Sequence, residues 1–275
     1  MIELLDYDFM RRALLAAVFT GLAAPAIGVF LVHRRLALLG DGLGHVALTG
    51  VALGLLTGIA PLVTAIAVAA LGALIIELLR AKGRTSGDVA LAMLFYGGIA
   101  GGVLLTNLAD ESAASLNSYL FGSITTVSTS DLVVVGVLGA VIVAACLGLA
   151  PQLFAVCQDE EHAKVSGLPV WLFSALISVL AAVTITVAMR TVGLLLVSAL
   201  MVVPVAAAQQ VTRSFRSTHL FAMVIGLAAA LGGVVASYEI ETSPGPTIVM
   251  LAIVAFAVLT VVGASKRKFR PRPTE

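Results

Sequence analysis

The most informative shortage in this 275-residue sequence is charge, because only 11% of its residues are Asp, Glu, Lys or Arg. An average soluble domain carries about 25% charged residues. Apolar residues make up 60% of the chain, and the mean hydropathy is +1.10. This composition excludes a soluble globular enzyme, a disordered chain and a nucleic-acid-binding protein. It predicts an all-α, polytopic membrane protein.

Cysteine and nucleotide-binding motifs are also scarce. The two cysteines, Cys146 and Cys157, cannot form a disulfide framework, and the spacing typical of zinc fingers is missing. The Gly-x-x-x-x-Gly-Lys-Ser/Thr spacing of a phosphate-binding loop is missing too. The longest polar connection lies near residues 151–168. Residues 1–275 are therefore expected to form a single membrane domain that is not an enzyme.

Long stretches without charged residues predict the membrane spans. A spanning helix needs about 20 mostly apolar residues. The longest stretch, 42–76, divides before Pro61, because proline favours a helix start and disfavours helix in the residue before it. Nine spans are predicted, at residues 13–32, 36–58, 61–79, 88–107, 131–149, 169–189, 191–211, 219–238 and 245–264.

Two segments do not fit this pattern. Residues 112–130 contain nine Ser or Thr residues and are predicted to be interfacial or re-entrant. The stretch before residue 13 carries Glu3, Asp6 and Asp8, whereas the start of a cleavable signal is usually basic. The first span is therefore expected to be retained.

The basic residues orient the chain. With nine spans and an outside N-terminus, 13 of the 16 Lys and Arg residues fall on one side, which the positive-inside rule places in the cytoplasm. These include the tail at 266–275, so the C-terminus is predicted to be cytoplasmic. Arg11, Arg12 and Arg190 fall on the other side. If the first span flips or the seventh is re-entrant, the number of spans becomes eight.

Asp41 and His45 are the strongest candidates for a functional site, because ionisable residues inside a membrane are costly. They are four residues apart, so they share one helix face about 6 Å apart along the axis. A carboxylate with an imidazole suits Zn²⁺, Mn²⁺ or Fe²⁺ better than Cu⁺. A symmetric dimer with this face on its axis would bring two such pairs together.

Other interpretations of this pair stay open. Gly40, Gly44, Gly50 and Gly54 allow close helix packing, so a structural Asp–His hydrogen bond is an equal alternative. The pair could also relay protons in a secondary transporter driven by an ion gradient. A membrane scaffold without transport activity is a third hypothesis.

Three further ionisable residues are weaker candidates for a functional site, and Glu77 is expected to be structural. Glu77 lies near the cytoplasmic end of the third predicted span, from which its side chain can reach the membrane surface. His33 and His219 lie at cytoplasmic borders beside basic residues and are predicted to be interfacial.

Residues 158–168 are predicted to form a short cytoplasmic helix. Asp159, Glu160 and Glu161 fill its first turn, which favours the helix dipole, and Gly167 ends it before Pro169 starts the next span. Such a helix could dock a cytoplasmic partner. The alternative is an ordinary amphipathic connector.

Three segments together resemble the permease family of ATP-binding-cassette importers for zinc, manganese and iron. Residues 41–52 resemble the signature Asp-x-x-Ser-His-Ala-x-x-Pro-Gly, with Gly44, Val46 and Thr49 in place of Ser, Ala and Pro. Residues 159–167 are similar to the loop that contacts the ATPase. Residues 192–208 resemble the run Val-Gly-x-Leu-Leu-Val-x-Ala-Leu-x-x-x-Pro. Residues 119–123 and 244–249 add weaker matches.

The resemblance implies a bacterial plasma-membrane homodimer that binds a cytoplasmic ATPase dimer and an extracytoplasmic metal-binding protein. ATP would be bound by the partner subunit, and the permease would have no cofactor of its own. Asp41 and His45 of both copies would hold the transported ion, with zinc the first choice and manganese or iron the alternatives. Alternating access would be driven through a coupling helix whose contact residues are Asp159, Glu160, Glu161, Ala163 and Gly167.

Overall fold

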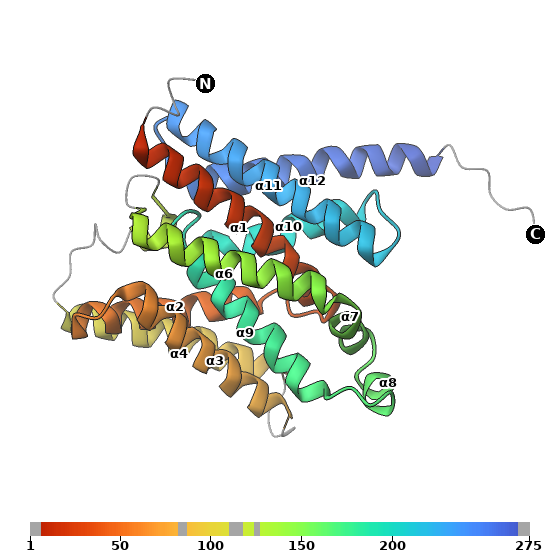
Figure 1. The fold of residues 1–275 in the computed structure, drawn as a ribbon, viewed down its shortest axis with the longest axis horizontal. Helices are drawn as coiled ribbons and strands as arrows, with labels where there is room; N and C mark the ends of the chain where they lie inside the picture. The colour runs from red at the N-terminus through yellow and green to blue at the C-terminus, as the bar shows by residue number, and fades with distance from the viewer. Residues whose placement is uncertain (1–6, 82–86, 110–117, 124–126, 269–275) are drawn as a thin grey trace, which may run out of the picture.

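The computed structural model describes residues 7–81, 87–109, 118–123 and 127–268, and every regular element in these ranges is a helix (Figure 1). The prediction of an all-α membrane fold is confirmed. Eight helices are long and apolar enough to cross a membrane. Their bounds are α1 Asp8–His33, α2 Leu39–Thr57, α3 Pro61–Ala81, α4 Gly87–Leu108, α6 Thr129–Gly148, α9 Val170–Ala188, α11 Phe215–Glu239 and α12 Pro244–Lys268.

The seventh predicted span is a shorter helix, α10 (Leu194–Gln209, 16 residues). At 1.5 Å per residue it is about 24 Å long. It runs beside α12: a Cβ added at Gly245 would meet the Val192 carbonyl, and one added at Gly263 would meet the Gln210 carbonyl. α10 and its flanking turns therefore extend along nearly the whole of α12.

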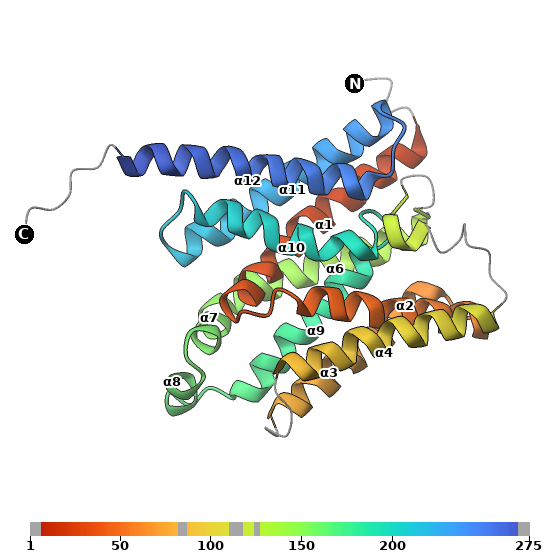
Figure 2. The ribbon, with the colours of Figure 1, turned by 180° about the vertical axis from the view of Figure 1, so that it is seen from behind.

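α1 lies at the centre of the bundle. Its most apolar window is 72% buried, against 22% for α4 and for α12. α6 and α9 pack against it, as do α10 and α11, while α2 joins α3 and α4 on one side (Figures 1 and 2). Phe30, Ile27 and Leu31 of α1 are among the largest fully buried side chains. α4 and α12 are left as outer helices that present apolar faces.

The connection after α6 differs from the prediction of one polar connector. It contains two helices, α7 (Ala150–Gln158) and α8 (Glu160–Val165). The helix breaks at Leu149, because Pro151 lies in the first turn of α7 and cannot donate a backbone hydrogen bond. Leu153 and Val156 are buried and hold α7 to the bundle. The predicted helix at 158–168 is present, but its helical part is shorter.

About half of the predicted re-entrant segment, 112–130, lies outside the described residues. Of the part that is described, Ser128 caps α6: its hydroxyl accepts from the Asp131 amide at 3.1 Å, and its own amide donates to the Asp131 carboxylate at 3.2 Å. Thr129 and Ser130 already belong to α6. The last residues of the segment therefore begin a spanning helix.

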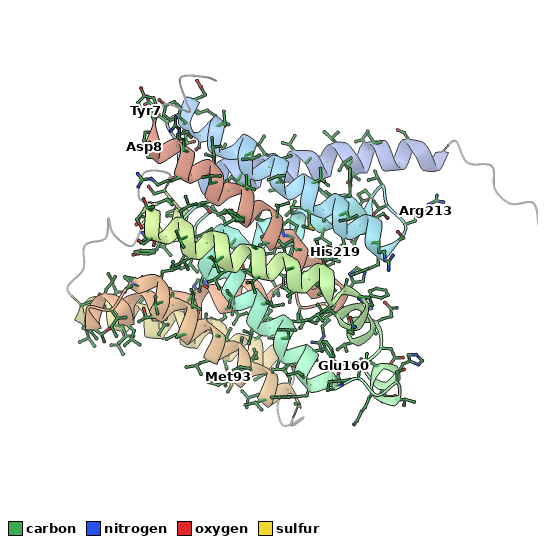
Figure 3. All side chains as sticks on the ribbon, in the orientation of Figure 1. Tyr7, Asp8, Met93, Glu160, Arg213 and His219 are labelled. Carbon is green, nitrogen blue, oxygen red and sulfur yellow. The ribbon has the colours of Figure 1, made fainter. Side chains whose placement is uncertain are left out.

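The two ends of the bundle are distinct. Tyr7 and Asp8 lie at one end, and Glu160 and Arg213 lie at the other (Figure 3). We call the second end the basic end, because it also carries Arg34, which pairs with Glu160, and Lys164 of α8. The described termini of α1 and α12 lie at opposite ends (Figure 1).

Candidate metal site

Asp41 and His45 open onto one small cavity inside the bundle. Asp41 lies in the first turn of α2, and His45 follows one turn later on the same face. Both side chains are half-buried. The cavity has a volume of about 250 Å³, and its other lining residues are Gly44, Leu48, Phe95, Leu120, Leu194 and Leu195. The predicted pair is thus brought together, with apolar walls around it.

Ser198 of α10 holds the Asp41 carboxylate. Its hydroxyl donates a hydrogen bond to Asp41 Oδ1, and the serine is only 8% exposed. The two helices approach closely at this point, because a Cβ added at Gly40 would lie 2.9 Å from the Ser198 Cβ. Sequence reasoning missed Ser198, since nothing in a single sequence relates two residues 157 positions apart.

His45 is fixed from the opposite side by α4. Its ring packs edge-on against Phe95, with ring centroids 4.5 Å apart and an interplanar angle of 79°. Thr49, one turn further along α2, donates from its hydroxyl to the Gly98 carbonyl at 2.8 Å. The threonine that replaces proline in the signature therefore forms a hydrogen bond between two helices.

Two helices begin beside this site. α2 starts at Leu39 and α10 starts at Leu194, so both positive helix ends lie within about two turns of Asp41. These dipoles stabilise the Asp41 carboxylate. The described residues contain no group of three or more His, Cys, Asp or Glu that could hold a metal. One copy of the chain therefore offers one carboxylate and one imidazole here.

Three of the five predicted contact residues stabilise the short helix α8 itself. The Asp159 carboxylate caps its first turn by accepting from the His162 amide at 2.9 Å. Ala163 is 1% exposed and anchors the helix to the bundle. Gly167 ends it with a φ of +82°, a left-handed conformation that glycine adopts without strain.

The other two predicted residues of α8 differ in their surroundings. Glu160 forms an ion pair with Arg34, whose side chain is only 4% exposed and which ends α1. Glu161 is exposed. Val165, which the sequence did not single out, is 88% exposed at the end of the helix. α8 thus presents a free apolar tip and is tied to the loop that leads from Arg34 to α2.

Cys157, at the end of α7, lies close to the Arg34–Glu160 ion pair. Its Sγ is 3.8 Å from the Phe30 carbonyl. Burial raises the pKa of the thiol to about 12, although the Arg34 charge opposes that rise and the Glu160 charge adds to it. Cys157 is therefore a neutral thiol, unsuited to nucleophilic chemistry.

Residues 6–263 of the chain match the ABC 3 transport family. The chain belongs to this family. A manganese import system permease protein, ScaB of Streptococcus parasanguinis, is 30% identical over 96% of this chain and 94% of its own length. A high-affinity zinc uptake system membrane protein, ZnuB of Haemophilus influenzae, is 26% identical over 92% of this chain and 97% of its own length.

A solved structure agrees with this assignment. The structure of PsaBC from Streptococcus pneumoniae in complex with Fab is 29% identical in sequence and superposes with a TM-score of 0.86. The superposition covers 97% of this chain and 98% of the matched PsaBC chain. The overall fold of this ABC 3 chain is therefore a family fold.

A second polar cluster of this ABC 3 protein lies at the Asp8 end and was not predicted. Arg190, at the turn between α9 and α10, pairs with Asp131 at 3.3 Å and lies 4.9 Å from the centre of the Tyr119 ring. The Ser123 amide donates to the Arg190 carbonyl at 3.1 Å. Because the neighbouring Leu120 lines the Asp41 cavity, Arg190 holds residues 118–123 over that cavity.

Glu77 and His219 are buried more deeply than the sequence suggested. Glu77 is 6% exposed and accepts hydrogen bonds from Ser178 at 3.2 Å and from Arg80 at 3.3 Å, so it does not reach the membrane surface. His219 is 2% exposed and is packed among aromatic rings. In both cases a neighbouring helix covers a residue that hydropathy alone places at a border.

Proposed function

We propose that this chain is the membrane permease of an ATP-driven importer for a divalent transition metal, with zinc as the first choice and manganese or iron as alternatives. The observation that carries this proposal is the pairing of Asp41 and His45 in one cavity within the bundle. A carboxylate oxygen and an imidazole nitrogen are ligands that borderline divalent ions accept. The apolar walls leave these two side chains as the charged or basic groups that face the cavity.

The proposed transport site is shared by two copies of the chain. Zinc sites commonly have four ligands, or three with an open position, and one copy supplies two. A two-fold axis beside the half-buried face of Asp41 and His45 would supply two of each. Carboxylates and imidazoles accept zinc, manganese and iron alike, so zinc is the first choice on family resemblance alone, and a manganese-named relative has the higher identity.

The proposed energy input enters through α8. The exposed Glu161 and Val165 offer a contact surface for a separate ATPase dimer that binds ATP. The ion pair between Glu160 and Arg34 ties that surface to the loop before Asp41. A displacement of α8 would thus move the start of α2 and switch the site between the two membrane faces, which is alternating access.

The proposed location is the bacterial plasma membrane, with the basic end in the cytoplasm. A metal-binding protein would then deliver the ion at the opposite end, where Arg190 holds residues 118–123 over the cavity. The C-terminus would be cytoplasmic.

The experiment is metal uptake by cells that lack the gene, complemented with the wild type, Asp41→Asn or His45→Ala. Zinc, manganese and iron are measured by elemental mass spectrometry, and Asp8→Asn, at the far end of α1, is the control. We expect one metal to be restored by the wild type and the control and lost in both site variants. Normal uptake by either site variant would remove that residue from the path. Transport in liposomes with a pH gradient and no ATPase would favour the proton-relay alternative.

A further inference from the structure

A larger cavity lies at the basic end and shares no lining residue with the Asp41 cavity. Its volume is about 630 Å³, and it lies between the α6–α7 break on one side and the start of α11 on the other. The wall residues that matter for its chemistry are Leu147, Gly148, Phe154, Arg216, His219 and Leu220. None of these residues has a part in the proposed transport path.

The side walls of this cavity are apolar and open toward the surrounding bilayer. Leu147 is 43% exposed and Leu220 is 57% exposed. One turn beyond Leu220, Val224 is 58% exposed on the same face of α11. The cavity therefore continues into a lipid-facing apolar strip, which suits an acyl chain.

His219 supplies an unpartnered polar atom in the wall. The residue is 2% exposed, and its Nε2 is covered and has no hydrogen-bond partner among the described residues. Its ring packs at a right angle to Phe30, with centroids 5.4 Å apart, and also contacts Phe215. The ring lies close to the Ala26 carbonyl, and Nε2 is a ring nitrogen left without a partner. A buried polar atom of this kind calls for a partner from a ligand.

The mouth of the cavity is positively charged. Arg216 is exposed there, and α11 begins there with Ser214, whose hydroxyl accepts from the Ser217 amide at 3.3 Å. A helix N-terminus and a guanidinium both favour phosphate. Arg213 lies in the preceding turn, at the same end of the molecule (Figure 3). No acidic side chain is among the residues that line this cavity.

We propose that this cavity binds an anionic glycerophospholipid whose headgroup carries a hydroxyl, of the phosphatidylglycerol type. The phosphate would lie against Arg216 and the start of α11, and the headgroup hydroxyl would donate to His219 Nε2 once the side chains that cover this atom move aside. One acyl chain would run between Leu147 and Leu220. Helix side chains lean toward the helix N-terminus, which places the His219 ring at headgroup level rather than deep among the acyl chains.

The bound lipid would brace the α6–α7 break against α11. α7 leads directly into α8, so the lipid would hold the base of α8 in place. This inference does not depend on which ion is carried, and the binding experiment below does not involve metal or ATP.

The test is quenching by brominated lipids in nanodiscs of the purified full-length protein. Trp171 is the single tryptophan and is replaced by Phe, and Val224→Trp provides a reporter beside the cavity without lining it. We expect brominated phosphatidylglycerol to bind about five-fold more tightly than brominated phosphatidylcholine, the factor given by one basic residue facing an anionic lipid. Brominated phosphatidylmethanol, a phosphodiester with the same single negative charge but no headgroup hydroxyl, should bind more weakly than phosphatidylglycerol.

Two variants make the test specific. Arg216→Gln removes the phosphate partner, and Gly148→Leu fills the cavity at a position where an added Cβ meets nothing within 4 Å. Both should abolish the preference, whereas Arg213→Gln, outside the lining, should keep it. Thermal unfolding checks that each variant is folded. Equal quenching by phosphatidylglycerol and phosphatidylcholine, or a preference that survives both variants, would overturn the proposal. Equal binding of phosphatidylmethanol and phosphatidylglycerol would overturn the role of His219.

Discussion

At the scale of single residues, the site depends on partners from distant parts of the chain. Asp41 is oriented by Ser198 of α10, and His45 is oriented by Phe95 of α4. Glu77 similarly depends on Ser178 of α9. The sequence predicted Asp41 and His45 through their spacing, because two residues four apart share a helix face whatever the tertiary fold. Their partners depend on how helices pack, which spacing does not encode.

Ser198→Ala tests the orientation of the Asp41 carboxylate. A hydrogen bond to a charged group contributes about 1.5–3 kcal/mol, so its loss should lower the initial rate of metal uptake by about ten-fold or more. Ser198→Thr keeps the hydroxyl and should retain most of the rate. Ser174→Ala, at another buried serine, is the matched control. If Ser198→Ala transports like the wild type, the hydroxyl has no part in positioning the carboxylate.

Cys157 should resist alkylation in the folded protein. At pH 8.5 an ordinary thiol is about half ionised, whereas a thiol whose pKa is raised to about 12 has roughly a thousand-fold less thiolate. Labelling by iodoacetamide, followed peptide by peptide with mass spectrometry, should be slow in mild detergent and fast in denaturant. Its rate in the folded protein should keep rising with pH above 9. Labelling within ten-fold of the denatured rate would contradict the buried placement.

At the scale of helices, close approaches hold the central α1 in place. A Cβ added at Gly28 would overlap the Met201 carbonyl of α10, and Pro25 fits against Gly226 of α11. Long apolar windows predicted eight of the spanning helices, including the start at Pro61. They did not predict α7, because a nine-residue helix needs only two buried side chains and leaves no long apolar signal.

Gly28→Ala should destabilise the protein by about 1–3 kcal/mol, because the added methyl forces α1 away from α10. Gly97→Ala is the matched control, since a Cβ there meets nothing within 4 Å. Removing a glycine from a helix interior stabilises it by up to about 1 kcal/mol, so the control should unfold at the same or a higher temperature. The measurement is thermal unfolding in detergent, and equal midpoints for the two variants would contradict the contact.

Exchanging the charges of Arg34 and Glu160 tests whether α8 acts on α2 through their ion pair. Arg34→Glu or Glu160→Arg alone brings like charges together and should lower ATP-driven uptake several-fold. The double variant restores opposite charges and should recover part of the rate. The assay is metal uptake by cells that also carry the proposed partner ATPase. If the losses of uptake in the two single variants simply add in the double variant, the Arg34–Glu160 ion pair does not couple α8 to α2.

At the scale of the whole molecule, the two described ends of the chain lie on opposite faces of the bundle (Figure 1). The eight long helices and the short α10 together make nine crossings, and an odd number of crossings places the two ends on opposite sides. The sequence predicted the same count, but it left eight and nine spans open. Hydropathy does not decide between them, since a 16-residue apolar helix is below the usual length of a span.

Cysteine labelling of intact cells tests this arrangement. In a background with Cys146 and Cys157 replaced by Ala, a membrane-impermeant maleimide should label Thr242→Cys, in the exposed turn between α11 and α12. It should label Glu161→Cys, on α8, only after lysis. The opposite labelling pattern would mean that the protein has the inverted orientation in the membrane. Labelling of both positions in intact cells would show that the two positions do not lie on opposite sides of the membrane.

The shortness of α10 has an electrical consequence. A bilayer core is about 30 Å thick, whereas α10 covers about 24 Å and its first turn borders the Asp41 cavity. Water at both ends of this helix would narrow the insulating layer there, so the membrane voltage would fall over a shorter distance than through pure lipid. A divalent ion gains roughly 4–5 kcal/mol per 100 mV over the full drop. Shortening the drop from about 30 Å to about 24 Å would raise the energy gained per ångström by about a quarter.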